Sequence, residues 1–133
     1  MDISESLQEI FESNETLGKK FYKKFFRACP EAEKFFEGLD MHRQAVVLTM
    51  AFTLVEQFYK SPYVQTAVYF HVLGASHRDM GIPKSMFEPW LQTMLQTLAE
   101  FHGDRWDKEL EEQWQVGLNA AAEEMFQGYD LPN

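Results

Sequence analysis

The sequence predicts an all-α fold, and three observations support this class. Apolar residues recur at the helical spacings i, i+3 and i+4 along most of the 133-residue chain. No segment shows the apolar–polar alternation or the Asn-Gly turns that mark strands and hairpins. Between the periodic segments, Gly, Pro, Ser and Asp stand where helices begin or end. We expect six or seven helices in a single domain, residues 1–133, because a chain of this length holds one core.

The first half of the chain predicts a short helix around residues 4–12 and two further segments. The segment NETLGKKFYKKFFRAC gathers its aromatic residues on one face and four lysines on the other. After Pro30, a turn-like piece ends at Phe35 and Phe36, and Asp40 is a suitable N-cap for a long helix over residues 41–59. The apolar stripe expected on that helix consists of Val47, Leu48, Ala51, Phe52 and Val55.

The next helix is expected to follow the motif SPY. Ser61 is placed as its N-cap and Pro62 as its first helical residue, where a missing N–H does no harm. The helix then leads to His77, and Gly81 can end it in a left-handed conformation.

Two long helices complete the prediction. Ser85 and Glu88 have capping-box spacing, which puts Pro89 in the first turn of a helix that reaches Phe101. A last helix is expected from about residue 104 to residue 127. Its aligned residues are Trp106, Leu110, Trp114, Gly117, Leu118, Ala121 and Met125.

Composition and charge narrow the functional classes. The net charge of −9 argues against binding to nucleic acid or to an anionic membrane, because both need a basic surface. No apolar run approaches the roughly 20 residues that span a bilayer. The single cysteine, Cys29, fits a reducing compartment, so a cytoplasmic location is expected. The twelve Phe and seven Met predict either a core built from large side chains or one shaped around a flat apolar guest. Catalytic motifs and zinc-ligand spacings are absent.

His77 raises the main functional question. It shares a helix face with Leu73 and Tyr69, and Gly74 is expected to leave open space beside that face. The ring could donate one N–H to a carbonyl one turn earlier and offer its other nitrogen to a ligand, as an axial iron ligand does. The alternative is a structural core histidine. The residues alone leave both interpretations open.

Tyr22 and Gln44 are the other polar residues of interest. Tyr22 lies on the apolar face of its helix, so its hydroxyl must find a partner inside the protein. Alternatively, the hydroxyl reaches the surface or a backbone carbonyl. Gln44 stands in the first turn of the 41–59 helix, one turn before Leu48.

Several motifs in order resemble the globin family, and more narrowly the single-domain bacterial globins. They are FYKKFFRACPEAEKFF, the helix that follows DMHRQ, the motif LGASHRDMGI, and two long final helices with Trp114 in the last. The resemblance covers nearly the whole chain. It implies a three-over-three helical sandwich, with a short first helix because only residues 1–21 precede Tyr22.

The resemblance implies a haem b cofactor and assigns residues to it. His77 matches the proximal iron ligand, Phe36 the phenylalanine that stacks on the porphyrin, and Tyr22 the tyrosine that faces bound gas. Gln44 takes the distal position, although an alternative alignment places His42 there. The complete set implied for cofactor binding is Phe36, Tyr22, Gln44, Leu48, Leu73, His77, Ile82 and Phe87.

The implied activity is reversible binding of dioxygen, carbon monoxide or nitric oxide at five-coordinate iron, by a monomer or homodimer. Conversion of nitric oxide to nitrate would need electrons from a separate reductase, because the chain contains no dinucleotide- or flavin-binding motif. A gas sensor and a six-coordinate electron-transfer protein closed by His42 are the alternatives. Some bacterial globins carry a tyrosine ten residues after the proximal histidine. Phe87 at that position argues against peroxidase-like chemistry.

Overall fold

The computed structural model describes residues 1–132, and every regular element in this range is helical. The all-α prediction is therefore confirmed. The α-helices are α1 (Ile3–Glu12), α2 (Leu17–Ala28), α3 (Met41–Lys60), α4 (Val64–Asp79), α5 (Phe87–His102) and α6 (Lys108–Gly128). Three 3₁₀ segments, η1 (Pro30–Phe36), η2 (Lys84–Met86) and η3 (Gly103–Arg105), connect them.

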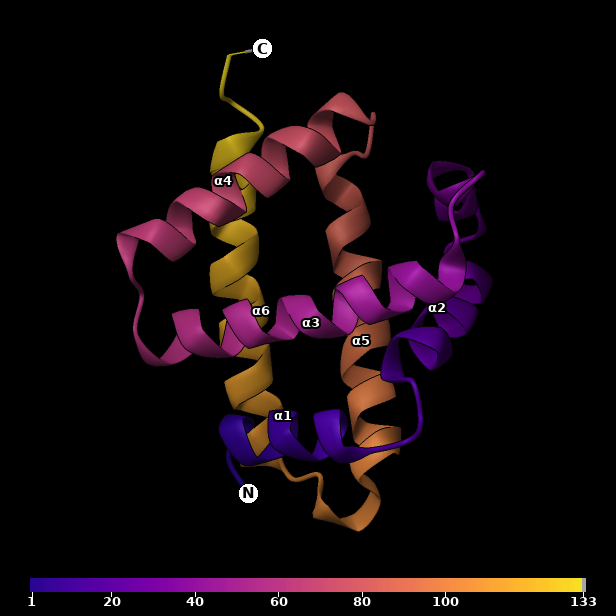
Figure 1. Ribbon diagram of the computed structural model, residues 1–133, viewed down its shortest axis with the longest axis vertical. Coiled ribbons are helices and arrows are strands. Elements are labelled where there is room, and N and C mark those ends of the chain that lie inside the picture. The colour runs from indigo at the N-terminus through magenta and orange to yellow at the C-terminus, as the bar shows by residue number, and fades with distance from the viewer. Residues whose placement is uncertain (133) are drawn as a thin grey trace.

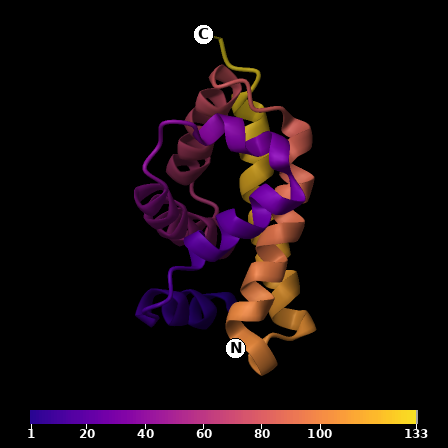
Figure 2. The ribbon, with the colours of Figure 1, turned by 90° about the vertical axis from the view of Figure 1, so that its right-hand side faces the viewer.

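The helices form two layers that cross each other. In Figure 1, α1, α3 and α4 run across α5 and α6, which stand side by side. The view in Figure 2 separates the two layers and brings α2 toward the viewer. Within this arrangement α3 contacts both α2 and α6, α4 packs on α6, and α2 packs on α5. The core between the layers contains the fully buried side chains Trp114, Phe21, Phe52, Leu91, Met94, Leu98 and Leu110.

Two of the predicted helix starts are confirmed by their hydrogen bonds. The Asp40 carboxylate accepts from the backbone N–H groups of His42 and Arg43 at 3.0 and 3.3 Å and so caps α3. The first helix is short, as expected, and is capped by Asp2, which accepts from the N–H of Glu5. Caps of this kind typically contribute about 1 kcal/mol each.

The predicted start of α4 is wrong. Ser61 does not cap α4; its N–H donates to the carbonyl of Gln57 and ends α3. Because a residue before proline avoids the helical region, Ser61 is extended, and Tyr63 is extended too. The helix therefore begins only at Val64, two residues beyond Pro62.

The predicted starts of the last two helices also need correction. Ser85 makes no capping hydrogen bond, because the chain enters α5 directly from the 3₁₀ turn η2 with Met86 already in helical conformation. Pro89 does lie in the first turn of α5. The last helix begins at Lys108 rather than near Asp104, and its cap is Asp107, which accepts from the N–H of Leu110 at 2.8 Å.

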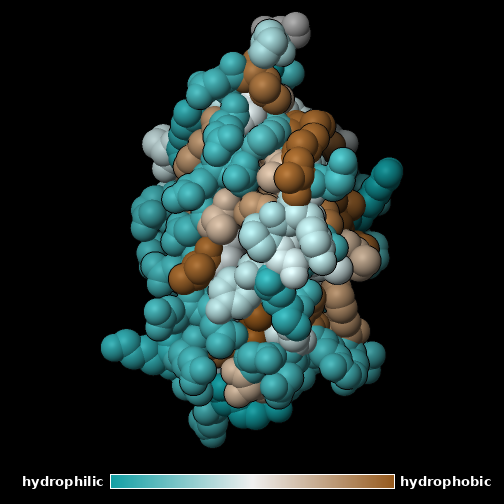
Figure 3. Space-filling view, turned by 90° about the vertical axis from the view of Figure 1, so that its left-hand side faces the viewer, coloured by the Kyte–Doolittle hydropathy of each residue, from teal (hydrophilic) through white to brown (hydrophobic). Residues whose placement is uncertain are grey.

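Hydrophilic residues cover most of the face drawn in Figure 3. Figure 3 shows one face on which hydrophobic residues form separate patches among hydrophilic ones. Val47, expected in the inward stripe of α3, is 52% exposed, whereas Phe52 and Val55 of that stripe are buried. No helix in the described range is long and apolar enough to cross a membrane.

Candidate functional site

The imidazole of His77 lies near the C-terminal end of α4 and is half-buried. Its Nδ1 is 2.8 Å from the backbone carbonyl oxygen of Leu73, one turn earlier. A carbonyl oxygen only accepts hydrogen bonds, so Nδ1 must carry the hydrogen. In the neutral ring the lone pair then belongs to Nε2, which makes no hydrogen bond to any residue among 1–132. This arrangement presents a single, oriented nitrogen donor.

The chain after His77 is held by a Schellman turn. Gly81 has a φ of +85°, as predicted, and its N–H donates to the carbonyl of Arg78. The N–H of Ile82 donates to the carbonyl of His77 itself at 3.1 Å. The hydroxyl of Tyr129 in turn donates to the carbonyl of Ile82 at 2.7 Å, so the C-terminal end of the chain is tied to this corner. Tyr129 was not predicted, because nothing in the sequence links it to residue 82.

The helix that carries His77 packs unusually closely on α6. A Cβ atom at Gly74 would overlap the backbone carbonyl of Met125, and one at Gly128 would overlap that of His71. The expectation that Gly74 leaves open space is therefore wrong; the missing side chain lets two backbones approach. His71 Nε2 also lies 2.6 Å from a carboxylate oxygen of Glu124 across this crossing. Two small residues and one polar pair thus fix the position of α4.

Tyr22 of α2 and Gln44 of α3 are in direct contact. The side-chain amide of Gln44 donates to the Tyr22 hydroxyl oxygen at 3.3 Å, so the phenolic hydrogen remains available to another acceptor. Tyr22 is only 6% exposed. Burial raises the pKa of its phenol, and the hydrogen bond from Gln44 opposes this in part. His42, the alternative distal residue, is exposed on the first turn of α3.

Aromatic side chains contact Tyr22 and Phe87. Phe36 touches Tyr22 edge-on, with ring centroids 5.1 Å apart, and Phe26 also contacts both rings. Phe87 stacks on Trp90 at 5.9 Å. The predicted residues Phe36, Leu48, Leu73 and Phe87 are all partly buried and packed against the core rather than inside it. Trp90 and Phe26 extend this aromatic wall beyond the predicted set.

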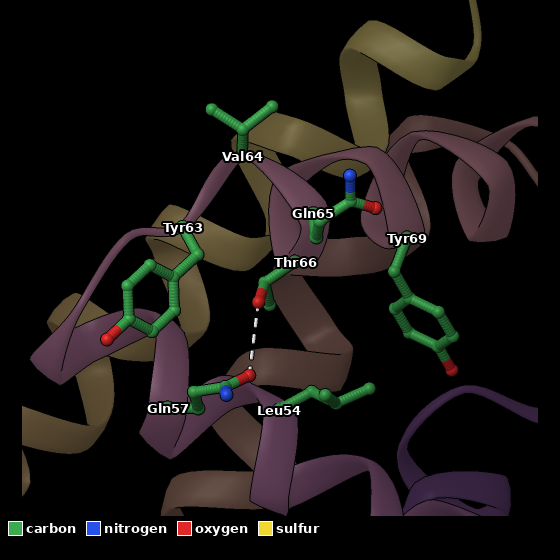
Figure 4. A pocket seen from close by; sticks show the side chains of 7 residues that line it. All are labelled: Leu54, Gln57, Tyr63, Val64, Gln65, Thr66 and Tyr69. Atoms are coloured by element: carbon green, nitrogen blue, oxygen red, sulfur yellow. Dashed lines mark hydrogen bonds between the residues drawn. The ribbon is translucent and has the colours of Figure 1, made fainter.

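An open pocket of about 560 Å³ lies where α3 joins α4, at a distance along both helices from His77 and Gln44. Figure 4 shows its lining, in which the hydroxyl of Thr66 donates to the Gln57 side chain at 3.0 Å. The lining residues are Leu54, Gln57, Tyr63, Val64, Gln65, Thr66 and Tyr69. None of them belongs to the predicted cofactor-binding set.

The side-chain atoms able to bind a metal limit the kind of cofactor that these residues fit. Among residues 1–132, no group of three or more His, Cys, Asp or Glu side chains gathers to hold a metal ion. A single histidine nitrogen, on a chain that also offers half-buried Phe and Leu side chains, fits a metal held inside a planar apolar cofactor. His77 would hold the metal of such a group, and the half-buried residues Leu73, Phe87, Phe36 and Leu48 would supply apolar contacts to it.

The sequence of the chain matches a known protein family. No curated protein sequence matches the chain. The family model described as Globin matches residues 19–125, most of the 133-residue length. The matched range runs from within α2 to within α6 and includes Tyr22, Gln44 and His77. The chain belongs to the globin family.

Proposed function

We propose that this globin binds haem b and, through it, reversibly binds dioxygen and other diatomic gases, with residues 1–133 acting as one domain. The observation that carries the proposal is the hydrogen bond from His77 Nδ1 to the Leu73 carbonyl, which directs Nε2 away from the helix backbone. Haem would supply an iron atom that His77 could hold and that could bind a gas molecule. Side chains of the protein hold the cofactor and contact the gas molecule.

Tyr22 and Gln44 are proposed to hold the gas molecule. The Tyr22 hydroxyl keeps its hydrogen free, since Gln44 occupies only its oxygen. A phenol with the ordinary pKa of 10.0 is neutral and able to donate at neutral pH, and burial raises the pKa of Tyr22 further. A hydrogen bond to a ligand that gains negative charge is worth about 1.5–3 kcal/mol, so slow dioxygen release is expected.

The exposed position of His42 favours a five-coordinate resting iron over closure by that residue. Conversion of nitric oxide to nitrate is the reactive extension of this proposal. We propose that a separate reductase would supply the electrons that this reaction needs.

The decisive variant is His77→Gly, tested with and without added imidazole. Haem titration of this variant should give a weaker, blue-shifted Soret band, and free imidazole should restore the wild-type spectrum by occupying the vacated position. His71→Gln on the same helix is the matched control and should keep the wild-type spectrum, because His71 contacts Glu124 instead. A wild-type spectrum in His77→Gly without imidazole would remove His77 from the iron.

A further inference from the structure

The outward side of α2 carries a row of exposed cations. Lys19, Lys23 and Arg27 follow one another at i, i+4 and i+8, so they lie along one line of the helix, and all three are exposed. The neighbouring lysines, Lys20 and Lys24, form ion pairs with Glu15 and Glu100. Within the described chain, the three residues of the row form no ion pair. We call Lys19, Lys23 and Arg27 the α2 cationic row.

The row is unfavourable for α2 by itself. Like charges four residues apart destabilise a helix by about 0.2–0.5 kcal/mol per pair. The first turn of α2 contains no acidic residue, and Thr16 makes no side-chain capping bond. Glu15, just before the helix, pairs with Lys20, and only Arg27, in the last turn, lies where a cation favours the helix dipole. The chain has 21 acidic residues, yet none occurs within Leu17–Ala28. Positive charge is therefore concentrated on α2, although the net charge of the whole chain is −9.

The distribution of charge around the α2 cationic row favours one class of binding partner over the others. A bilayer or a nucleic acid extends past the row and meets the acidic remainder of the surface, which repels it. The apolar side of α2 is buried in the core, so the helix has no face to insert into lipid. A folded protein with a compact acidic patch can contact the row alone, and such complementarity steers association.

The position of the row indicates what such a partner does. The inward side of the same helix carries Tyr22 of the proposed gas site, and a helix is only about 10–12 Å across. We propose that the α2 cationic row docks an acidic one-electron carrier protein, such as a flavoprotein, that reduces the iron of the bound haem. One electron leaves the reduced cofactor of the partner and converts ferric iron to ferrous iron. This inference rests on the haem function proposed above.

The test uses reduced flavodoxin, an acidic flavoprotein, as the electron-donor probe. Its bimolecular rate of reduction of the ferric haem-loaded protein is followed by stopped flow under carbon monoxide, at low and high salt. The row variant combines Lys19→Glu, Lys23→Glu and Arg27→Glu. The control variant combines Lys60→Glu, Lys84→Glu and Lys108→Glu, which changes the net charge equally at three scattered positions.

For the wild type, the rate should fall steeply with salt, since electrostatic steering raises association rates about 10- to 1,000-fold. The row variant should be at least about tenfold slower at low salt, while the control stays within about threefold of the wild type. A variant with glutamine at all three positions of the row should be reduced at a rate between those of the row variant and the control variant. Equal rates in row and control variants, a rate indifferent to salt, or reduction by dithionite but not by flavodoxin would each overturn the proposal.

A second measurement is independent of haem. Calorimetric titration of oxidised flavodoxin into the haem-free chain should show salt-sensitive binding that the row variant loses and the control keeps. If the chain took up no haem, the proposed function would fail while this titration still reported on the surface. Row-dependent binding of heparin or phosphatidylglycerol vesicles at physiological salt, without flavodoxin binding, would replace the protein partner by a polyanion and refute the inference.

Discussion

Single hydrogen bonds determine the chemistry of the proposed site. The Leu73 carbonyl selects which nitrogen of His77 carries the hydrogen, and Gln44 leaves the Tyr22 hydroxyl free to donate. The spacing of four residues between Leu73 and His77 made the first contact predictable from the sequence. The contact between Gln44 and Tyr22 joins residues 22 apart in the sequence, so it depended on the resemblance to globins and not on local periodicity.

Tyr22→Phe tests the donor role of the phenol. Removal of one hydrogen bond to a ligand that gains charge should raise the dioxygen dissociation rate about tenfold or more. Stopped-flow displacement of dioxygen by carbon monoxide measures this rate. Tyr59→Phe, on α3 beside Gly117, is the control and should leave it unchanged. If Tyr22→Phe released dioxygen at the wild-type rate, Tyr22 would not face the ligand.

The N-cap of α3 was predicted correctly, whereas the N-caps of α4 and α5 and the role of Gly74 at a helix crossing were not. Asp40 capped α3 as expected because its carboxylate needs only the two N–H groups that follow it. Ser61 and Ser85 have equally suitable side chains, but Pro62 keeps Ser61 extended and the turn η2 leads the chain into α5 without a cap. The role of Gly74 was misjudged because a close helix crossing depends on α6, which lies far away in the sequence.

The crossing of α4 and α6 gives a paired prediction. Gly74→Ala should lower the free energy of unfolding by about 1–3 kcal/mol or more, because the new methyl group meets the Met125 backbone, which cannot move aside easily. Gly117→Ala should raise it by about 0.5–1 kcal/mol through helix propensity. There the Cβ meets only side chains at ordinary contact distances, the nearest being Val55 Cγ1 at 3.4 Å. Urea unfolding compares the two variants, and equal effects would refute this account of the crossing.

A buried polar cluster attaches α1 to α5 and α6. The hydroxyl of Ser6 accepts from the indole N–H of Trp114 at 3.0 Å and lies 2.6 Å from His102 Nε2. All three side chains are buried, and His102 Nδ1 has no partner among residues 1–132. Burial lowers the pKa of His102 below its ordinary value of 6.5, and the positive N-terminus lowers it further. The contact between Ser6 and His102 thus attaches the short helix α1 to α5, and burial favours the neutral form of the His102 ring.

The pH dependence of stability follows from this cluster. Because the folded-state pKa of His102 is depressed, its contribution is present above pH 6.5, the ordinary value, and is lost as the pH falls below it. Urea unfolding between pH 8 and pH 5 should show this loss in the wild type. The His102→Gln variant should show a smaller decline, while His42→Gln, at an exposed position, should match the wild type. Identical pH profiles for wild type and His102→Gln would exclude His102 as the cause.

At the scale of the whole molecule, periodicity predicted the helices but not how they cross. The two layers and the short α1 were expected from the resemblance to globins, and the order and contacts of the helices agree with it. Exposure of residues such as Val47 could not be predicted from helical spacing, because the direction of the inward face is set by the helices packed around α3. The proposed function assigns His77 from α4 and Tyr22 from α2 to one site.

The central claim is that His77 binds haem iron and leaves the opposite position open to gas. The most direct test is the visible absorption spectrum of the haem-loaded chain, oxidised and dithionite-reduced, before and after addition of carbon monoxide. We expect an intense Soret band, a single broad visible band in the reduced form, and a shift of the Soret band with carbon monoxide. Sharp paired bands before gas is added would instead reveal a sixth ligand from the protein. No Soret band after haem addition would contradict the claim outright.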